Sequence, residues 1–169
     1  EGTAVARSAQ RVEVVLSEQW RDDPVSFVAR MGEIEARHDA ACTLLQAPDM
    51  DSLPGLDALE STDVALFFTR RLRIGGADLE RVKKFCASGR PIVAVRTASH
   101  GFQNWLEFDA LVLGGSYKGH FGAGETLEAK VAPGAERHPI LEGVGPLRTL
   151  ASLYKAAPLA PGAELLLSG

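Results

Sequence analysis

Two histidines, His100 and His120, stand in polar loop segments and are the residues best suited to chemistry. An imidazole can transfer a proton or bind a metal near neutral pH. His100 ends the segment 96–100, and His120 lies in the glycine-rich segment 114–122. We expect both histidines to line one crevice as catalytic candidates. Side chains that can hydrogen-bond to a ligand or stack on it surround them and are the ligand-binding candidates: Arg96, Thr97, Ser99, Trp105, Glu107, Tyr117 and Lys118.

Other interpretations of these residues stay open. Each histidine could be a structural loop residue, the aromatic rings could fill space, and Lys118 could be a solvated charge. A divalent metal such as zinc could be held by the two histidines with Glu107 or Asp109, although the spacing matches no H-E-x-x-H motif. Hydrolysis by Ser99 or Thr97 with His100 as the base is disfavoured, because neighbours on an extended chain point to opposite sides.

The first hundred residues alternate between β-branched apolar runs and helical patterns, which predicts a parallel sheet with right-handed crossovers. The apolar runs at 63–69 and 91–95 are typical of strands buried on both faces. Asp23 is expected to cap the first helix, which begins at Pro24. The expected strands are 11–17, 40–45, 63–69 and 91–95, a polar loop spans 18–23, and the second helix is 77–89. The catalytic candidates would then lie at the carboxyl edge of this sheet.

The second half has a different texture, because 9 of the 17 glycines fall between residues 101 and 145. The glycines in 114–124 match neither a dinucleotide-binding fingerprint nor a P-loop, so they also fit a glycine-rich surface loop. No internal repeat or linker divides the chain. We expect a single domain over residues 1–169 that lacks part of its termini, because the chain begins at Glu1 and ends on an apparent strand at 165–167.

Composition excludes several classes of protein. The 169 residues carry a net charge of −4, with a pI of about 5.6 and no basic cluster beyond Arg70, Arg71 and Arg73, so nucleic acid is not an expected partner. No apolar run approaches the ~20 residues that span a bilayer. We expect a soluble chain that is either cytoplasmic or, after removal of an N-terminal signal, periplasmic or secreted. The sequence leaves open whether the protein forms a homo-oligomer. Cys42 and Cys86 are expected to be unpaired and buried.

Three spaced motifs carry a resemblance to a known family: the segment 89–102, then 108–109 with 113–120, and finally 138–140 with Gly143. Together they resemble the trehalose-utilisation (ThuA-like) family. The resemblance spans most of the chain and implies an α/β, flavodoxin-like, doubly wound and mainly parallel sheet of the class I glutamine amidotransferase superfamily, with a glycine-rich, loop-rich C-terminal half.

The sequence departs from the amidotransferases at their nucleophile. In those enzymes the corresponding strand runs into a strained turn that presents a cysteine, whereas this chain has Arg96 and Thr97 there. His138-Pro139 is similar to the end of their triad, but Ile140 replaces the carboxylate, which favours a simple His-Pro turn. Glutaminase activity is therefore not expected. The resemblance implies binding or processing of a carbohydrate or keto-sugar; the alternative is a noncatalytic binding or scaffold module.

Overall fold

The computed structural model describes residues 9–16, 24–122, 124 and 126–169. These residues form two compact units, Glu1–Phe108 and Asp109–Gly169, and each unit is described by itself. The expected single domain over residues 1–169 stays a prediction. The expectations for Ser17, the loop 18–23 and the Asp23 cap lie outside the described residues.

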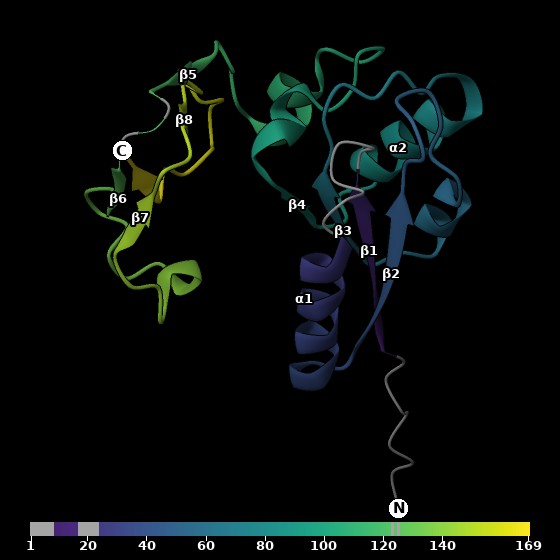
Figure 1. The fold of residues 1–169 in the computed structure, drawn as a ribbon, viewed down its shortest axis with the longest axis horizontal. Helices are drawn as coiled ribbons and strands as arrows, with labels where there is room; N and C mark the ends of the chain where they lie inside the picture. The colour runs from purple at the N-terminus through teal and green to yellow at the C-terminus, as the bar shows by residue number, and fades with distance from the viewer. Residues whose placement is uncertain (1–8, 17–23, 123, 125) are drawn as a thin grey trace, which may run out of the picture. The chain divides into compact units, whose positions relative to one another are not determined.

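The first unit is built on a four-stranded sheet in which every neighbouring pair of strands is parallel. The strand order is β2-β1-β3-β4, which is the order of the flavodoxin-like fold and confirms the expected fold class (Figure 1). The strands are β1 (Gln10–Leu16), β2 (Ala40–Gln46), β3 (Val64–Phe68) and β4 (Ile92–Ala94). All four therefore end at the same edge of the sheet, where the sequence places the polar candidates.

Two α-helices connect these strands, α1 (Pro24–Arg37) between β1 and β2 and α2 (Gly76–Ala87) between β3 and β4. The apolar face of α2 buries Leu79, Val82 and Phe85, whereas the periodicity predicts Leu79, Val82 and Cys86 on that face. A 3-10 helix, η2 (Leu56–Glu60), precedes β3, and a second one, η3 (Arg96–His100), follows β4. The segment around His100 is therefore helical and not extended.

An aromatic cluster fixes the segment after β4 to the sheet. Phe67 of β3 is fully buried, and its ring meets those of Phe102 and Phe108 edge-on at centroid distances of 6.1 and 5.9 Å. Phe102 and Phe108 are themselves 5.0 Å apart. Each buried aromatic ring removes a large apolar area from water and prefers such edge-to-face geometry. The chain just beyond η3 is thus anchored in the core.

The two strands expected to be buried on both faces are less enclosed than the sequence suggests. β3 alternates, with Ala65 and Phe67 buried and the residues between them half-buried. β4 is at the edge of the described sheet, and its Val93 is 50% exposed. The expectation of full burial was wrong within this unit because apolar runs do not distinguish a central strand from an edge strand.

The second unit consists of short antiparallel strands joined by long loops, as its glycine content predicts. β6 (Leu127–Val131) lies between β7 (Leu147–Thr149) and β9 (Leu167–Ser168), while β5 (His120–Phe121) pairs with β8 (Leu153–Tyr154). A π-helix, η4 (Asp109–Leu113), begins the unit, and a 3-10 helix, η5 (Pro139–Leu141), lies between β6 and β7. Of the strand expected at 165–167, only Leu167 belongs to a strand, β9.

Both cysteines are free, as expected, but each is half-buried rather than fully buried. Cys42 is on β2, an edge strand of the sheet, and Cys86 is near the end of α2. Burial raises the pKa of the Cys86 thiol to about 11. Burial, followed by the charges of Glu35 and Glu13, also raises the pKa of Cys42. Both thiols are thus protonated near neutral pH and are poor nucleophiles.

Within the described part of the chain, the helices are all too short or too polar to cross a bilayer.

Candidate functional site

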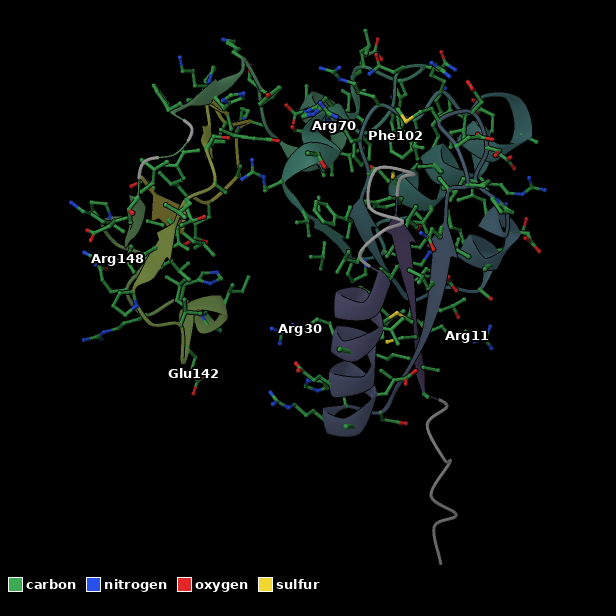
Figure 2. All side chains as sticks on the ribbon, in the orientation of Figure 1. Arg11, Arg30, Arg70, Phe102, Glu142 and Arg148 are labelled. Atoms are coloured by element: carbon green, nitrogen blue, oxygen red, sulfur yellow. The ribbon has the colours of Figure 1, made fainter. Side chains whose placement is uncertain are left out.

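The segments that follow β3 and β4 lie side by side at the carboxyl edge of the sheet. The strands are in register at Phe67 and Ala94. Beyond them, the Arg71 N–H donates to the His100 carbonyl (2.9 Å), and the Leu72 N–H donates to the Gly101 carbonyl (2.8 Å). Arg70 and Phe102, one from each segment, appear at this end of the first unit in Figure 2. The two segments therefore form one continuous surface, hereafter the β3–β4 edge, comprising residues 69–72 and 96–102.

Close packing at this edge requires a glycine at position 101. A Cβ there would lie 2.3 Å from Thr69 Oγ1 and 3.0 Å from the Ala98 carbonyl oxygen. Both distances are well inside normal van der Waals contact. The absence of a side chain at Gly101 therefore lets the turn after β4 approach the end of β3.

Two threonine hydroxyls at the β3–β4 edge are buried without a hydrogen bond. Thr69 is 0% exposed and Thr97 is 6% exposed. Neither Oγ1 atom has a hydrogen-bond partner among the described residues. A buried hydroxyl in this state costs about 1–3 kcal/mol, so most buried hydroxyls in proteins are paired. Two such atoms at neighbouring strand ends mark a place where the described residues leave buried polar groups without partners.

The same edge carries strained backbone. Arg71 has φ 53° and Arg96 has φ 41°, and they are the non-glycine residues with positive φ among the residues described. Arginine rarely adopts this left-handed conformation, which costs of order 1–3 kcal/mol per residue and gathers at functional sites. Arg96 directly follows Val95 and begins η3, so the strained residue lies in the turn after β4.

Ser99 and His100 interact through their side chains. Ser99 Oγ lies 3.2 Å from His100 Nδ1, a hydrogen-bond distance whose donor depends on the histidine tautomer. The expectation that these neighbours point apart was wrong, because η3 is a helical turn rather than extended chain. Both residues are half-buried. A hydroxyl held against an imidazole is an arrangement that can orient the ring for proton transfer.

Trp105 and Glu107 differ in their surroundings. The Trp105 ring packs at 5.2 Å from Phe108 and 6.4 Å from Phe102, and Lys83 Nζ lies 5.9 Å from its centroid. Trp105 therefore extends the aromatic cluster and is only partly accessible to solvent. Glu107 is exposed. The ligand-binding roles expected for both residues stay predictions.

In the second unit, Asp109 organises the glycine-rich loop. Its Oδ2 accepts a hydrogen bond from the Tyr117 N–H at 2.7 Å. A Cβ at Gly115 would lie 2.7 Å from Asp109 Oδ1, so the loop closes tightly around the carboxylate. The Gly115 N–H also donates to the Asp109 carbonyl at 3.1 Å. This carboxylate is engaged in holding the loop, which counts against its expected role as a metal ligand.

The candidates carried by that loop lie near β8. The rings of Tyr117 and Tyr154 are 4.6 Å apart, and His120 is paired with Tyr154 across β5 and β8. Lys118 and His120 are exposed. His100 belongs to the first unit and His120 to the second, so their expected convergence stays a prediction. Among the described residues there is no group of three His, Cys, Asp or Glu side chains that could hold a metal ion.

His138 forms the turn that its proline predicts. Its Nδ1 accepts a hydrogen bond from the Ile140 N–H at 3.2 Å, and Pro139 begins η5. Its Nε2 lies 3.6 Å from Glu164.

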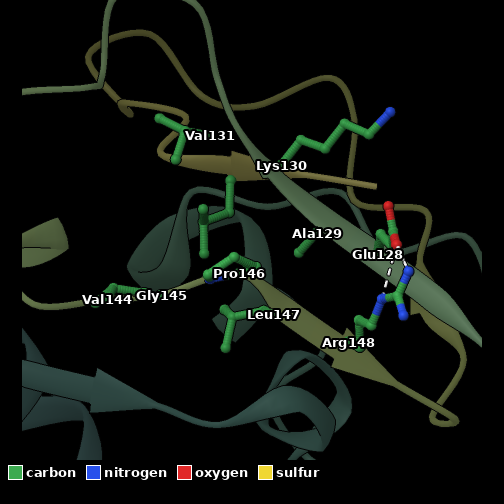
Figure 3. Close-up of a pocket in the computed structure, with 10 residues that line it drawn as sticks. Glu128, Ala129, Lys130, Val131, Val144, Gly145, Pro146, Leu147 and Arg148 are labelled. Carbon is green, nitrogen blue, oxygen red and sulfur yellow. Dashed lines mark hydrogen bonds and ion pairs between the residues drawn. The ribbon is translucent and has the colours of Figure 1, made fainter.

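A largely apolar pocket of about 620 Å³ lies in the second unit, against β6 and β7 (Figure 3). At its side, Arg148 Nε donates to Glu128 Oε1 at 2.8 Å. The expected site residues are all absent from its lining, which consists of Glu128–Val131, Val144–Arg148 and Leu167. With little polar lining of its own, this pocket offers a hydroxyl-rich ligand few partners.

Sequence reasoning left Thr69, Arg71 and Gly101 outside the candidate set. Their position just after an apolar strand is the one sequence signal that could have identified Thr69 and Arg71 as site residues. Neither residue belongs to a recognisable functional motif. The close approach of Gly101 to Thr69 joins the segments that follow two different strands, so no local sequence pattern reveals it.

Comparison with known proteins supports the fold. No family model and no curated protein matches the sequence. A crystal structure of a protein from Bacteroides uniformis, described as ThuA-like, superposes with a TM-score of 0.66 and 14% identity, covering 99% of this chain and 71% of that one. The resemblance expected from the sequence is thus confirmed at the level of the fold.

Proposed function

We propose that the protein is a ThuA-like protein that binds a carbohydrate or keto-sugar at the β3–β4 edge. The observation that carries this proposal is the pair of left-handed arginines, Arg71 and Arg96, at the ends of two adjacent parallel strands. Ligands of open α/β sheets bind outside the carboxyl ends of the strands, and strain of this kind persists where function requires it.

The chemistry of the edge suits a polyhydroxylated ligand. Ser99 and His100 offer groups that both donate and accept hydrogen bonds, as sugar hydroxyls do. The hydroxyls of Thr69 and Thr97 are buried at the same edge without a hydrogen bond, and we propose that a polar ligand bound there supplies partners for them. Tyr117, Lys118 and His120 lie in the second unit and are proposed separately as ligand-binding residues, with an aromatic ring that can stack on a sugar face.

Glutamine hydrolysis is not part of the proposed function. Arg96 and Thr97 stand in the turn where the amidotransferases have a cysteine, and neither a guanidinium nor an unassisted threonine hydroxyl replaces a thiolate. The Cys86 thiol lies on α2, with a pKa of about 11, and is not activated. His100, positioned by Ser99, is proposed to act as acid or base if the bound sugar is processed; binding without turnover corresponds to a noncatalytic module.

A thermal-shift screen with trehalose, glucose, keto-sugars and divalent metals tests the proposal. A ligand at a hundred times its dissociation constant adds about 2.7 kcal/mol to the free energy of unfolding. We expect a sugar to raise the melting temperature, and we expect His100→Ala to lose most of that shift at little cost in stability. His38→Ala is the matched control, because His38 is exposed before β2 at the opposite end of the strands. Equal shifts in both variants, or no shift with any sugar, contradict the proposal.

A further inference from the structure

The second unit contains another apolar pocket, of about 600 Å³, which the proposed function does not use. It is lined by β8, β9 and the chain segments beside them, and we call it the β8–β9 pocket. Its walls are mainly leucine and alanine side chains together with the ring of Phe121. Phe121 is 54% exposed, Leu159 37% and Leu165 50%. Exposed apolar side chains gathered around one hollow of this size are typical of a ligand-binding groove.

Backbone contacts hold the walls of this pocket in place. Phe121 of β5 is paired with Leu153 of β8. A Cβ at Gly169 would lie 2.5 Å from Leu153 Cδ1, so the chain after β9 packs directly against β8. The segment that follows β8 is fixed to the glycine-rich loop, because the Lys155 N–H donates to the Gly119 carbonyl at 2.9 Å. The pocket is therefore largely formed before a ligand enters, which lowers the entropic cost of binding.

Lys155 supplies a positive charge at this pocket. Among the side chains that line it, all from the described part of the protein, only that of Lys155 is charged, and it is exposed. Its Nζ lies 4.3 Å from the centroid of the Phe121 ring, which holds the ammonium group at the apolar wall. No carboxylate in the described ranges forms an ion pair with Lys155. Glu164, next to the lining in sequence, has its Oε2 3.6 Å from His138 Nε2 instead.

We propose that the β8–β9 pocket binds a small carboxylate with an apolar body, such as a medium-chain fatty acid. The apolar body covers Phe121, Leu159 and Leu165 and removes their exposed surface from water. The carboxylate pairs with Lys155 Nζ, because an ammonium group has three donors and the ring face occupies only one side of it. A cationic ligand is repelled by the same charge. The pocket belongs to the second unit, and the inference does not depend on sugar binding at the β3–β4 edge.

A titration of the whole chain with octanoate, 1-octanol and octylammonium, followed through the backbone amide NMR signals, tests the proposal. Octanoate should shift the signals of residues 153–157 and 165–168 and of Phe121 in a saturable manner. It should bind at least about fivefold more tightly than 1-octanol, a factor in keeping with one partly exposed ion pair. Octylammonium should bind more weakly than either ligand, and added salt should reduce the preference for octanoate.

Two pairs of variants separate the charge from the apolar walls. Lys155→Met keeps an unbranched apolar stem and should weaken octanoate about fivefold while leaving 1-octanol unchanged. Lys130 is exposed on β6 and absent from this lining, so Lys130→Met is the control and should change neither ligand. Leu165→Asn should weaken both ligands, because it removes part of the apolar wall. Leu150 is 67% exposed and also outside the lining, so Leu150→Asn is the control for that change.

Four results would overturn the proposal. Equal affinities for octanoate and 1-octanol, together with an unaffected Lys155→Met variant, show that the charge is not recognised. Equal weakening of octanoate by Lys130→Met attributes the effect to net charge and not to this side chain. Saturable shifts confined to residues 128–131 and 144–148 place the ligand in the pocket against β6 and β7. The absence of any saturable shift with octanoate at millimolar concentration refutes the β8–β9 pocket as a binding site.

Discussion

Replacement of Gly101 by alanine tests the packing that forms the β3–β4 edge. The new Cβ would lie 2.3 Å from Thr69 Oγ1 and 3.0 Å from the Ala98 carbonyl, against 3.4 Å or more for an ordinary contact. Overpacking of this kind costs about 1–3 kcal/mol. Since about 1 kcal/mol lowers the melting temperature of a domain this size by roughly 2–4 °C, Gly101→Ala should lower it measurably.

A double-mutant cycle identifies the source of that cost. Thr69→Ala removes the Oγ1 atom, the nearest group to the new Cβ, and leaves the Thr69 Cβ position at 3.4 Å and the Ala98 carbonyl in place. The double variant should therefore be less destabilised than the sum of the two single variants, with a coupling of about 0.5–3 kcal/mol measured by urea unfolding. Gly145→Ala, where a Cβ meets no atom within 4 Å, is the control. Additive effects would refute the juxtaposition of Thr69 and Gly101.

Three further predictions concern the core and the buried ionisable groups. Phe102→Ala should cost about 3–5 kcal/mol in urea unfolding, because a fully buried ring leaves a cavity; a loss below 1 kcal/mol would contradict the cluster. Burial of Glu13, opposed by hydrogen bonds from Thr43 and Thr62, raises the pKa of its carboxyl. Its contribution to stability is therefore complete below its unfolded-state pKa and is lost as pH rises through the folded-state pKa. Glu13→Gln should be more stable than the wild type at pH 7 and lose that advantage near pH 4. If the two proteins differ in free energy of unfolding by the same amount at pH 7 and pH 4, Glu13 does not ionise at a buried position. Cys86, with a pKa of about 11, should react with a disulfide reagent at pH 7 far more slowly than a free thiol, and rapid reaction would show an activated thiolate.

The fold of the first unit could be predicted from the sequence because its signals are local. The apolar runs, the charge pattern of α2 and the glycine after it each fall within a few residues. The burial of β4 could not be predicted, since Val93 sits in an apolar run but on the edge strand of the described sheet. An edge strand and a central strand differ in their neighbours in the folded protein, and an apolar run in the sequence does not specify those neighbours.

The candidate site was predicted only in part. Arg96, Thr97, Ser99 and His100 were found because they follow a strand, and they lie at the edge expected for them. The contact between Ser99 and His100 was missed, because an extended chain was assumed where the backbone forms a 3-10 turn. Thr69 acquires its importance only from residues about thirty positions further along the chain, a pairing that no local pattern reveals.

The most direct test of the central claim is a map of backbone amide NMR signals during titration with the sugar that binds most tightly. Binding at the β3–β4 edge should shift the signals of residues 69–72 and 96–102 in a saturable manner, and most of this response should be lost in His100→Ala. Saturable shifts confined to residues 128–131 and 144–148, which line the apolar pocket of the second unit, would place the ligand elsewhere and contradict the account.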